Sequence, residues 1–377
     1  MMIPFNKPYV GSNEQSYISQ VLAARKLSGD GEFTKKCHEW FEKRYGFKKA
    51  LLTTSCTAAL EMCAILLDIK PGDEVILPSY TFVSTANAFA LRGATLKFAD
   101  SLPDHPNIDP EQIASLISSR TRAIVVVHYA GTACDMDRIL SLAAQFNIPV
   151  VEDAAQAIEA TYKGRPLGSF GALASFSFHE TKNISCGEGG LLAINDKALI
   201  ARAEIIREKG TNRSSFFRGE VDKYGWVDIG SSYLPSDILA GFLFAQLENI
   251  EYIQGQRQRV WQRYWKNFTN AKLQEYAQLP NFSPHATNNA HMFYMVCPDL
   301  DTRSAVISSL KSQNILAVFH YLSLHASPFF TGQHDGRVLA NSDRYTDCLV
   351  RLPLFPELSD LEVDRISGIV IENFKQS

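Results

Sequence analysis

Short apolar runs alternate with amphipathic stretches of helical length from about residue 50 to residue 194. The apolar runs, which have the length of strands, are residues 74–77, 95–98, 123–127, 149–151, 174–178 and 190–194. Segments 57–67 and 136–145 lie between them and have helical periodicity. Continuously apolar strands separated by helices are typical of a mostly parallel sheet covered on both faces. The pattern therefore predicts an α/β fold.

Helices are also predicted in the parts of the chain that come before and after this sheet region. Apolar residues recur with helical spacing in segments 14–24 and 33–45. Ser236 is the expected N-cap of one long helix that runs from residue 237 to about residue 265 and carries an apolar stripe. We expect this helix to link the sheet region to a smaller unit.

The C-terminal part of the chain predicts a second α/β unit. Its expected elements are strands or strand ends at 289–294 and 320–325, a closing strand at 352–355 and a helix at 360–374. We therefore predict a large domain over residues 1–250 and a small domain over residues 251–377. This division agrees with the length of the chain, because domains average about 150 residues.

Composition and charge argue against two classes of binding partner, nucleic acids and membranes. The 377 residues are 46% hydrophobic and 20% charged, as in ordinary globular proteins. The net charge of −3 gives no electrostatic footprint for nucleic acid. No apolar run reaches the ~20 residues that span a bilayer, and the N-terminus lacks a basic start followed by an apolar segment. We expect a cytoplasmic protein that binds neither nucleic acid nor a membrane.

The seven cysteines are scattered along the chain and never form a Cys-x-x-Cys pair. Their odd number and irregular spacing argue against a disulfide framework and against a structural metal site. We expect reduced thiols, most of them buried, and no metal.

Ligands of parallel α/β sheets bind beyond the carboxyl ends of the strands, so the residues that follow each strand are the candidates for a site. Small hydroxyl residues fill segment 53–57 and lead directly into a predicted helix. The free amides of a helix N-terminus bind phosphate, although a plain N-cap explains the same residues. Neither a Gly-x-Gly-x-x-Gly motif nor a Walker motif occurs, so nothing favours a dinucleotide or nucleoside triphosphate.

Two further strand ends carry residues that suit an aromatic cationic ligand. Phe82 follows the strand at 74–77 and offers either a flat face for stacking or an ordinary core side chain. Asp153 follows Glu152 at the end of the strand at 149–151. Two buried acids require partners. Asp153 is therefore either a helix cap or the partner of a cationic ring nitrogen.

A lysine stands at the end of the strand at 174–178. Lys182 lies between small polar residues and the glycine-rich segment 187–190, which lets backbone approach a ligand. A single lysine is usually an exposed loop residue, but a lysine at this position is also able to form a Schiff base. A phosphate cradle, a stacking ring, a carboxylate and a lysine together are the contacts that pyridoxal 5′-phosphate (PLP) requires.

The same motifs support a family resemblance over almost the whole chain. Segments 54–60, 78–82, 152–156 and 176–183 resemble the DegT/DnrJ/EryC1/StrS family of sugar aminotransferases. Within this family, segments 127–131, 179–183 and 207–213 look closest to the transaminases that form dTDP-4-amino-4,6-dideoxygalactose for enterobacterial common antigen. The resemblance implies a PLP-dependent transferase of fold type I, similar to aspartate aminotransferase, and a homodimer with shared active sites.

The resemblance also implies roles for the residues around the cofactor ring. Lys182 would form the Schiff base with PLP and act as the catalytic acid and base. Asp153 would pair with the pyridine nitrogen and Phe82 would stack on the ring. Gln156 and His179 would lie near the substituents of the ring.

For the cofactor phosphate, the resemblance implies Cys56, Thr57 and Ser177. Relatives often carry an asparagine in the segment that matches 231–234, and this asparagine reaches the phosphate of the neighbouring subunit's cofactor. Here the segment has none, so Ser232 is the candidate substitute.

Five residues are candidates for the sugar-nucleotide side of the site. His291, Tyr321 and His325 lie in the C-terminal unit, where a buried satisfied histidine or a core tyrosine is the alternative explanation. Lys209 and Arg213 are candidates for the diphosphate, with solvated surface charges as the alternative.

The expected reaction moves an amino group from L-glutamate to C4 of a dTDP-linked 4-keto-6-deoxysugar. Amination at C3, or equatorial amination at C4, is the alternative within the family. A sugar dehydratase of the same fold is disfavoured, because those relatives replace the Schiff-base lysine with histidine and Lys182 is present. A catalytically silent sensor or scaffold is the alternative of another class, and intact Lys182, Asp153 and Ser177 argue against it.

Overall fold

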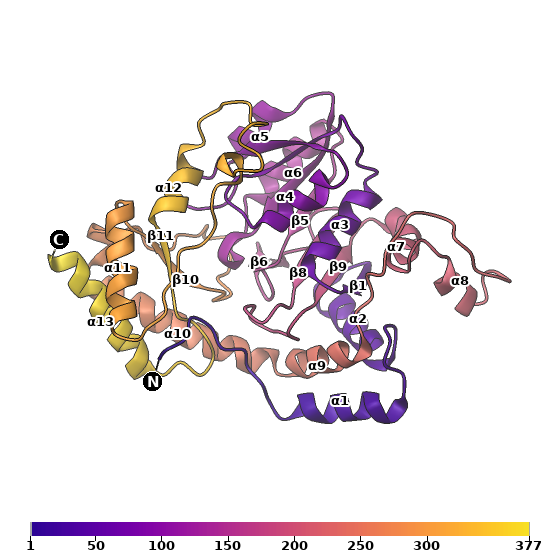
Figure 1. Ribbon diagram of the computed structural model, residues 1–377, viewed down its shortest axis with the longest axis horizontal. Helices are drawn as coiled ribbons and strands as arrows, with labels where there is room; N and C mark the ends of the chain where they lie inside the picture. Colours follow the sequence, from indigo (N-terminus) through magenta and orange to yellow (C-terminus); the bar gives the residue numbers. More distant parts are fainter. Residues whose placement is uncertain (1, 377) are drawn as a thin grey trace.

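The computed structural model describes residues 2–376 and centres on a seven-stranded sheet (Figure 1). In spatial order, the strands are β1 (Lys49–Thr53), β9 (Gly190–Ile194), β8 (Leu173–Ser177), β5 (Val150–Asp153), β4 (Thr121–Val127), β2 (Glu74–Pro78) and β3 (Thr95–Ala99). Only β9 runs antiparallel to its neighbours in this sheet, so the predicted mostly parallel α/β fold is confirmed.

Each face of the sheet has its own hydrophobic core, because successive strand residues point to opposite faces. Ile76 and Ile124 lie in the first core, whereas Leu77 and Val125 lie in the second. The first core is covered by α1 (Asn13–Ala24), α2 (Glu32–Tyr45), α5 (Pro110–Leu116), α6 (Met136–Gln145) and α9 (Asp237–Glu248). The second core is covered by α3 (Cys56–Leu66), α4 (Val83–Ala90) and α7 (Ile200–Arg207).

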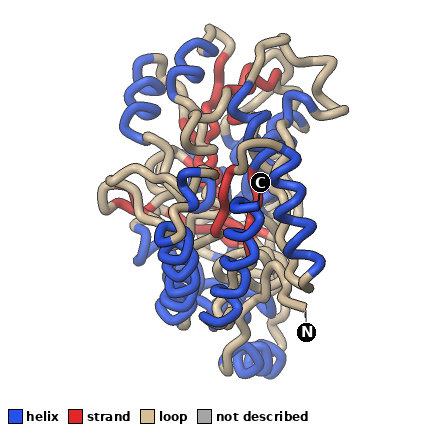
Figure 2. The backbone as a smooth tube through the Cα atoms, turned by 90° about the vertical axis from the view of Figure 1, so that its left-hand side faces the viewer, coloured by secondary structure: helices blue, strands red, loops and turns tan. Residues whose placement is uncertain are grey.

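The C-terminal elements form a smaller unit with a separate core. They are α10 (Ile250–Asn270), β10 (Phe293–Val296), α11 (Leu300–Ser312), α12 (Ala340–Cys348), β11 (Leu349–Leu352) and α13 (Asp360–Gln376). Ile3 pairs with Ile315 and lies in this core, so the N-terminal segment packs with the C-terminal elements. Both termini lie at this end of the molecule, which Figure 2 views directly. The division at residues 250 and 251 remains a prediction.

The predicted long helix is two helices, so its continuity was wrong. Ser236 does cap α9, since its hydroxyl accepts a hydrogen bond from the amide of Leu239. The helix then stops at Asn249, whose side-chain amide donates to the carbonyl of Ala245. Asparagine competes in this way for backbone groups and favours helix ends, and α10 begins at the next residue.

Two predicted strand positions in the C-terminal unit were also wrong. Segment 320–325 contains no strand and leads into the short 3₁₀ turn Leu324–Ala326. Its conformation follows from side-chain contacts, such as the hydrogen bond from the amide of Ser323 to the hydroxyl of Thr346. The closing strand ends at Leu352, where its prediction began, because Pro353 has no amide hydrogen for the ladder.

Residues 208–232 extend from the large unit as an arm, at the right of Figure 1. The arm contains α8 (Arg213–Phe217) and is closed by isolated bridges between Glu208 and Ser232 and between Thr211 and Trp226. The side chains of Phe217 and Trp226 are 70% and 82% exposed. Such apolar exposure on a projecting segment marks a surface that another molecule can cover.

The remaining short elements are the hairpin of β6 (Thr161–Tyr162) and β7 (Arg165–Pro166) and the 3₁₀ turns Tyr129–Gly131, Lys197–Leu199 and Leu273–Glu275. All seven cysteines are free thiols, as predicted. Across residues 2–376, none of the helices combines the length and the apolar content required to cross a bilayer.

Candidate active site

A cavity of about 760 Å³ lies between the carboxyl ends of the sheet strands and the C-terminal unit. Ten of the predicted site residues line it: Cys56, Thr57, Phe82, Asp153, Gln156, Ser177, His179, Lys182, His291 and Tyr321. They come from four separate strand or helix ends and from the C-terminal unit. The structure thus brings together the residues that the strand-end argument selected, whereas their roles remain predictions.

Lys182 lies in the loop after β8 and is held there by its neighbour in sequence. The side-chain amide of Asn183 donates to the carbonyl of Asn289 at 2.9 Å, and its oxygen lies 2.7 Å from Nδ1 of His291. This clamp fixes the lysine loop against the C-terminal unit. Among the described residues, no carboxylate lies within ion-pair distance of Nζ of Lys182. Burial lowers the pKa of the ammonium group, which favours the neutral amine that proton transfer requires.

Asp153 ends β5 and points its carboxylate at the cavity. One oxygen accepts from Oγ1 of Thr85 at 2.7 Å, and the other accepts from the amide of Ala155 at 3.1 Å. Burial raises the pKa of this carboxyl group, and these hydrogen bonds oppose the shift. Within residues 2–376, this buried carboxylate has two neutral donors and no ion-pair partner, so it is arranged to receive a cationic group from a ligand.

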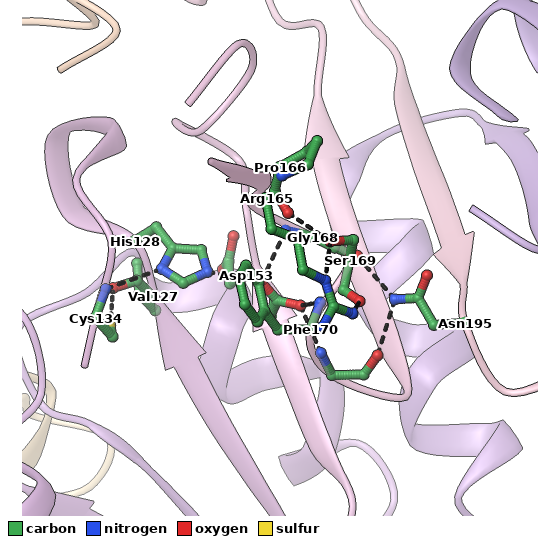
Figure 3. Close-up of polar contacts among 12 residues, drawn as sticks. Val127, His128, Cys134, Asp153, Arg165, Pro166, Gly168, Ser169, Phe170 and Asn195 are labelled. Atoms are coloured by element: carbon green, nitrogen blue, oxygen red, sulfur yellow. Dashed lines mark hydrogen bonds and ion pairs between the residues drawn. The ribbon is translucent and has the colours of Figure 1, made fainter. Parts of the chain in front are cut away.

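The preceding residue, Glu152, points to the other face of the sheet and is fully buried. Its carboxylate accepts from Nε2 of His128 at 2.9 Å and from the amide of Gly168 at 2.7 Å. Figure 3 labels these two partners, His128 and Gly168. The amides of Phe170 and Gly171 donate to its second oxygen at 2.7 and 2.6 Å. Glu152 therefore orders the loop before β8. Because successive side chains of β5 point to opposite faces of the sheet, Glu152 holds this loop, whereas Asp153 faces the cavity.

We expect Glu152→Ala to destabilise the protein by about 3–5 kcal/mol, because it leaves three buried amides and a buried imidazole without their acceptor. Urea denaturation followed by circular dichroism measures this loss. Glu372→Ala, on the exposed side of α13, is the control and should change stability by less than about 0.5 kcal/mol. Equal stabilities of the two variants would contradict the assignment of Glu152 to structure.

The N-terminus of α3 forms one wall of the cavity. Ser55 is its N-cap and accepts from the amide of Ala58 at 3.0 Å, so the N-cap explanation is correct for Ser55, whereas the phosphate cradle remains a prediction. The amides of Cys56 and Thr57 belong to the first turn, where an α-helix provides no acceptor. A Cβ atom on Gly190 would lie 2.3 Å from the carbonyl carbon of Ser55, so only glycine lets β9 begin against this helix end. The arrangement is suited to an anion.

Beside this wall, Phe82 exposes a ring at the mouth of the cavity. Its side chain is 54% exposed, which excludes the alternative that it is a core residue. The ring of Tyr321 lies 6.1 Å from that of Phe82, and the hydroxyl of Tyr321 accepts from Nε2 of Gln156 at 2.7 Å. Oε1 of Gln156 accepts from the amide of Ala130. These contacts fix the orientation of the Gln156 amide and of the Tyr321 phenol.

Four predicted site residues do not line the cavity. His325 is buried beside it, where Nδ1 lies 2.8 Å from Oγ of Ser79. Lys209, Arg213 and Ser232 lie on the arm with exposed side chains, and the guanidinium of Arg213 stacks on the ring of Phe217. Within a single chain, these arm residues are separate from the cavity.

Several cavity residues were missed by the sequence analysis, namely Phe5, Asn6, Arg257, His320 and Arg351. Arg257 is buried in α10, and its guanidinium donates to the carbonyls of Ala290 and His291. Burial lowers its pKa to about 9. In the sequence, the one available signal for Arg257 was its place within a predicted helix. An arginine that is buried there is informative, because arginine is rarely buried without a partner.

Comparison with known proteins agrees with this geometry. The family model described as the DegT/DnrJ/EryC1/StrS aminotransferase family matches residues 8–371. The uncharacterized protein MJ1066 of Methanocaldococcus jannaschii is 32% identical over 384 residues, which cover 98% of each chain.

Two solved structures share the fold over their whole length. The aminotransferase TlmJ from Streptoalloteichus hindustanus is 27% identical, with a TM-score of 0.91 and coverage of 100% of both chains. The aminotransferase from Psychrobacter cryohalolentis is 25% identical, with a TM-score of 0.92 and coverage of 100% of this chain and 99% of that one. The chain therefore belongs to the DegT/DnrJ/EryC1/StrS family of PLP-dependent sugar aminotransferases.

Proposed function

We propose that this protein moves the amino group of L-glutamate to C4 of dTDP-4-dehydro-6-deoxy-D-glucose and forms dTDP-4-amino-4,6-dideoxy-D-galactose for surface polysaccharide synthesis. The observation that carries the proposal is the single cavity in which Lys182, Asp153 and the N-terminus of α3 converge. The choice of sugar rests on the resemblance of segments 127–131 and 207–213 to transaminases of that specificity.

The residues present fit PLP. The carboxylate of Asp153 has two neutral donors and no cation partner among residues 2–376, as a site for a pyridinium nitrogen requires. The first-turn amides of Cys56 and Thr57 and the hydroxyl of Ser177 border the cavity and are placed to hold a phosphate. Phe82 would cover one face of the ring, and Lys182 would carry the aldehyde.

When bound, PLP supplies a ring that accepts the negative charge developing at the reacting carbon. Nζ of Lys182 takes the proton from Cα of glutamate and later returns a proton to C4 of the sugar. The lowered pKa of Lys182 suits it to both transfers, because the neutral amine is accessible to take up a proton and the ammonium group then gives a proton up more readily. The carboxylate of Asp153 keeps its cationic partner protonated through both half-reactions.

The side chains around Lys182 orient the substrates. Asn183 fixes the lysine loop through His291, so that Lys182 stays in the wall of the cavity. Gln156 and Tyr321 form one hydrogen-bonded pair on the far wall, where a hydroxyl or carbonyl group of a sugar would find donors and acceptors. His179 lies at the exposed rim, 3.8 Å from the carboxylate of Glu188.

A homodimer with shared active sites is part of the proposal. The exposed apolar side chains of the arm, Phe217 and Trp226, support it, because a second copy would bury them. In that assembly Lys209, Arg213 and Ser232 would serve the cavity of the partner, with the two cations near the diphosphate. Sedimentation equilibrium of the protein and of Trp226→Ser tests the dimer, which we expect the substitution to weaken.

The function is tested by supplying glutamate with dTDP-4-keto-6-deoxyglucose, or with its 3-keto isomer, and measuring continued release of 2-oxoglutarate, beyond the single equivalent that each active site forms from glutamate alone. We expect release with the 4-keto sugar alone. Release with only the 3-keto isomer would overturn the choice of C4. If glutamate bleaches the protein but neither sugar supports continued release, the protein is still a transaminase, and the proposed sugar substrate is wrong.

The pH dependence of cofactor capture tests the environment of Lys182. Only the neutral amine attacks an aldehyde, and burial lowers the pKa of this lysine from 10.5. The rate at which apo-protein captures PLP should therefore rise with pH and level off below pH 10.5, as followed by absorbance in a stopped-flow instrument. Nα-acetyl-lysine is the control and should level off near the ordinary lysine pKa. Coincident profiles would contradict the shift.

A further inference from the structure

Two irregular segments from different units of the chain meet at the mouth of the cavity. Residues 319–326 of the C-terminal unit include the cavity residue Tyr321, and this segment contains no strand that would fix its backbone. Residues 79–82 follow β2 in the large unit and include Phe82. The rings of Tyr321 and Phe82 lie 6.1 Å apart, so the position of one segment against the other shapes this wall of the cavity.

A buried contact between His325 and Ser79 joins the two segments. Nδ1 of His325 lies 2.8 Å from Oγ of Ser79, and the two residues are 7% and 0% exposed. The backbone adds to this contact, because the amide of Leu324 donates to the carbonyl of Ser79 at 3.0 Å. Ser79 is itself fixed, since its amide donates to the carbonyl of Ala99 in β3. The His325–Ser79 clasp therefore ties the C-terminal segment to the sheet.

The surroundings of His325 determine which ring nitrogen accepts. Oγ of Ser79 accepts from the amide of His325 at 3.3 Å, so its one hydrogen is free to donate to Nδ1. The neutral ring then carries its hydrogen on Nε2, which lies 3.6 Å from Oδ1 of Asp343. Burial is the largest cause that lowers the pKa of His325, and this favours the neutral ring. The clasp thus requires an acceptor at the position of Nδ1.

Tyr321 depends on this clasp for its place in the cavity wall. It lies four residues before His325, and its hydroxyl accepts from Nε2 of Gln156 at 2.7 Å. Its ring lies 5.8 Å from that of Tyr80, the residue after Ser79. A shift of the segment would separate the hydroxyl from Gln156, and a displacement of about 1 Å is enough to impair a positioned group in an active site.

We propose that His325 is a positioning residue, whose hydrogen bond with Ser79 holds Tyr321 against the large unit and thereby shapes the acceptor-sugar side of the cavity. His325 does not line the cavity itself, so this role differs from the predicted contact with the sugar nucleotide. The inference rests on the proposed function, in which Tyr321 and Gln156 are the groups that meet the sugar.

Three variants and one control test the clasp. His325→Leu and Ser79→Ala each remove one partner of the hydrogen bond. His325→Asn keeps an acceptor, because Oδ1 of asparagine is bonded to Cγ as Nδ1 of histidine is. The matched control is His285→Leu, at an exposed histidine outside the cavity. Ser79→Ala makes the smaller change in volume and takes the place of His325→Leu if that variant does not fold.

Hydrogen exchange with mass spectrometry measures the clasp without turnover. In the PLP-loaded full chain without substrates, peptides that contain Leu324 should exchange about 3- to 10-fold faster in His325→Leu and Ser79→Ala than in the wild type. This range is the one expected for loss of one neutral hydrogen bond. His325→Asn should recover most of the protection, and His285→Leu should match the wild type.

Steady-state kinetics at saturating glutamate measure the effect on the sugar. In His325→Leu and Ser79→Ala, we expect the KM for the 4-keto sugar to rise about 3- to 10-fold. The kcat should change by less than about twofold, because Lys182 and Asp153 are unaltered and the loss falls on substrate binding. His325→Asn should bring the KM back toward the wild-type value.

Four outcomes decide the proposal. Unchanged exchange in both His325→Leu and Ser79→Ala would overturn it. Equal losses in His325→Asn and His325→Leu would also overturn it, because packing of the imidazole would then hold the segment. Faster exchange with an unchanged KM for the sugar would show that the clasp does not shape the sugar side. If the wild-type protein aminates no keto sugar, the proposed function fails, while the exchange comparison still tests the clasp.

Discussion

We expect Lys182→Ala to lower transamination by at least about 10⁴-fold, since the substitution removes both the attachment of PLP and the acid–base group. Nζ of Lys182 has no ion-pair partner among the described residues, and its pKa is lowered by burial. No other lysine lines the cavity, within the part of the chain that the structure describes, so none can replace it. Release of 2-oxoglutarate from glutamate in the presence of the keto sugar measures the loss.

The matched control is Lys311→Ala, an exposed lysine near the end of α11. Both variants should fold, because Lys182 lies at a cavity wall and forms no side-chain hydrogen bond within residues 2–376. The absorbance of bound PLP should be absent from Lys182→Ala and retained in the control. Turnover above a trace in Lys182→Ala, with that absorbance intact, would contradict the assignment.

We expect Asp153→Asn to lower turnover by about 10²- to 10³-fold, the range found when a preorganised electrostatic contact is removed from an active site. Asparagine has the size of aspartate and keeps one oxygen to accept from the amide of Ala155, while its NH2 group can donate to Oγ1 of Thr85, whose own hydrogen can turn to Oγ1 of Thr81. It is neutral, however, and cannot stabilise a pyridinium. The variant should therefore bind PLP and bleach slowly with glutamate.

Asp347→Asn, on the exposed side of α12, is the control for the loss of one negative charge. Stability to urea should be equal in the two variants or higher in Asp153→Asn, because a buried carboxylate without a cation opposes folding. Wild-type turnover in Asp153→Asn would show that the carboxylate has no part in catalysis.

The sheet and most of the cavity were predictable because both depend on local signals. Continuous apolar runs marked β2, β4 and β5, and the small polar or charged residues that follow strands marked the candidate ligand contacts. Asp153 and Lys182, for example, lie at the end of β5 and after the end of β8, and the parallel pairing of these strands brings their ends to one edge of the sheet.

The remaining site residues depend on contacts that a linear pattern does not reveal. Arg351 reaches the cavity because β11 turns one face to the large unit, and Phe5 because the N-terminal segment packs with the C-terminal elements. Glu152 and Asp153 are equivalent as a sequence pattern. Only the direction of each side chain in β5 separates the structural acid from the acid of the cavity.

The break at Asn249 was missed for a related reason. The apolar stripe continues from α9 into α10, so periodicity alone predicts one helix. The competing hydrogen bond from Asn249 to the carbonyl of Ala245 decides the outcome. Arg257, in the second of the two helices, lines the cavity.

The most direct test of the proposed reaction is to incubate the protein with ¹⁵N-labelled L-glutamate and dTDP-4-keto-6-deoxyglucose, and to assign the product by NMR. We predict that the label is bonded to C4 and that the amine is axial, as in the galacto configuration. A label on C3, an equatorial amine at C4, or a sugar without label would contradict the proposed function.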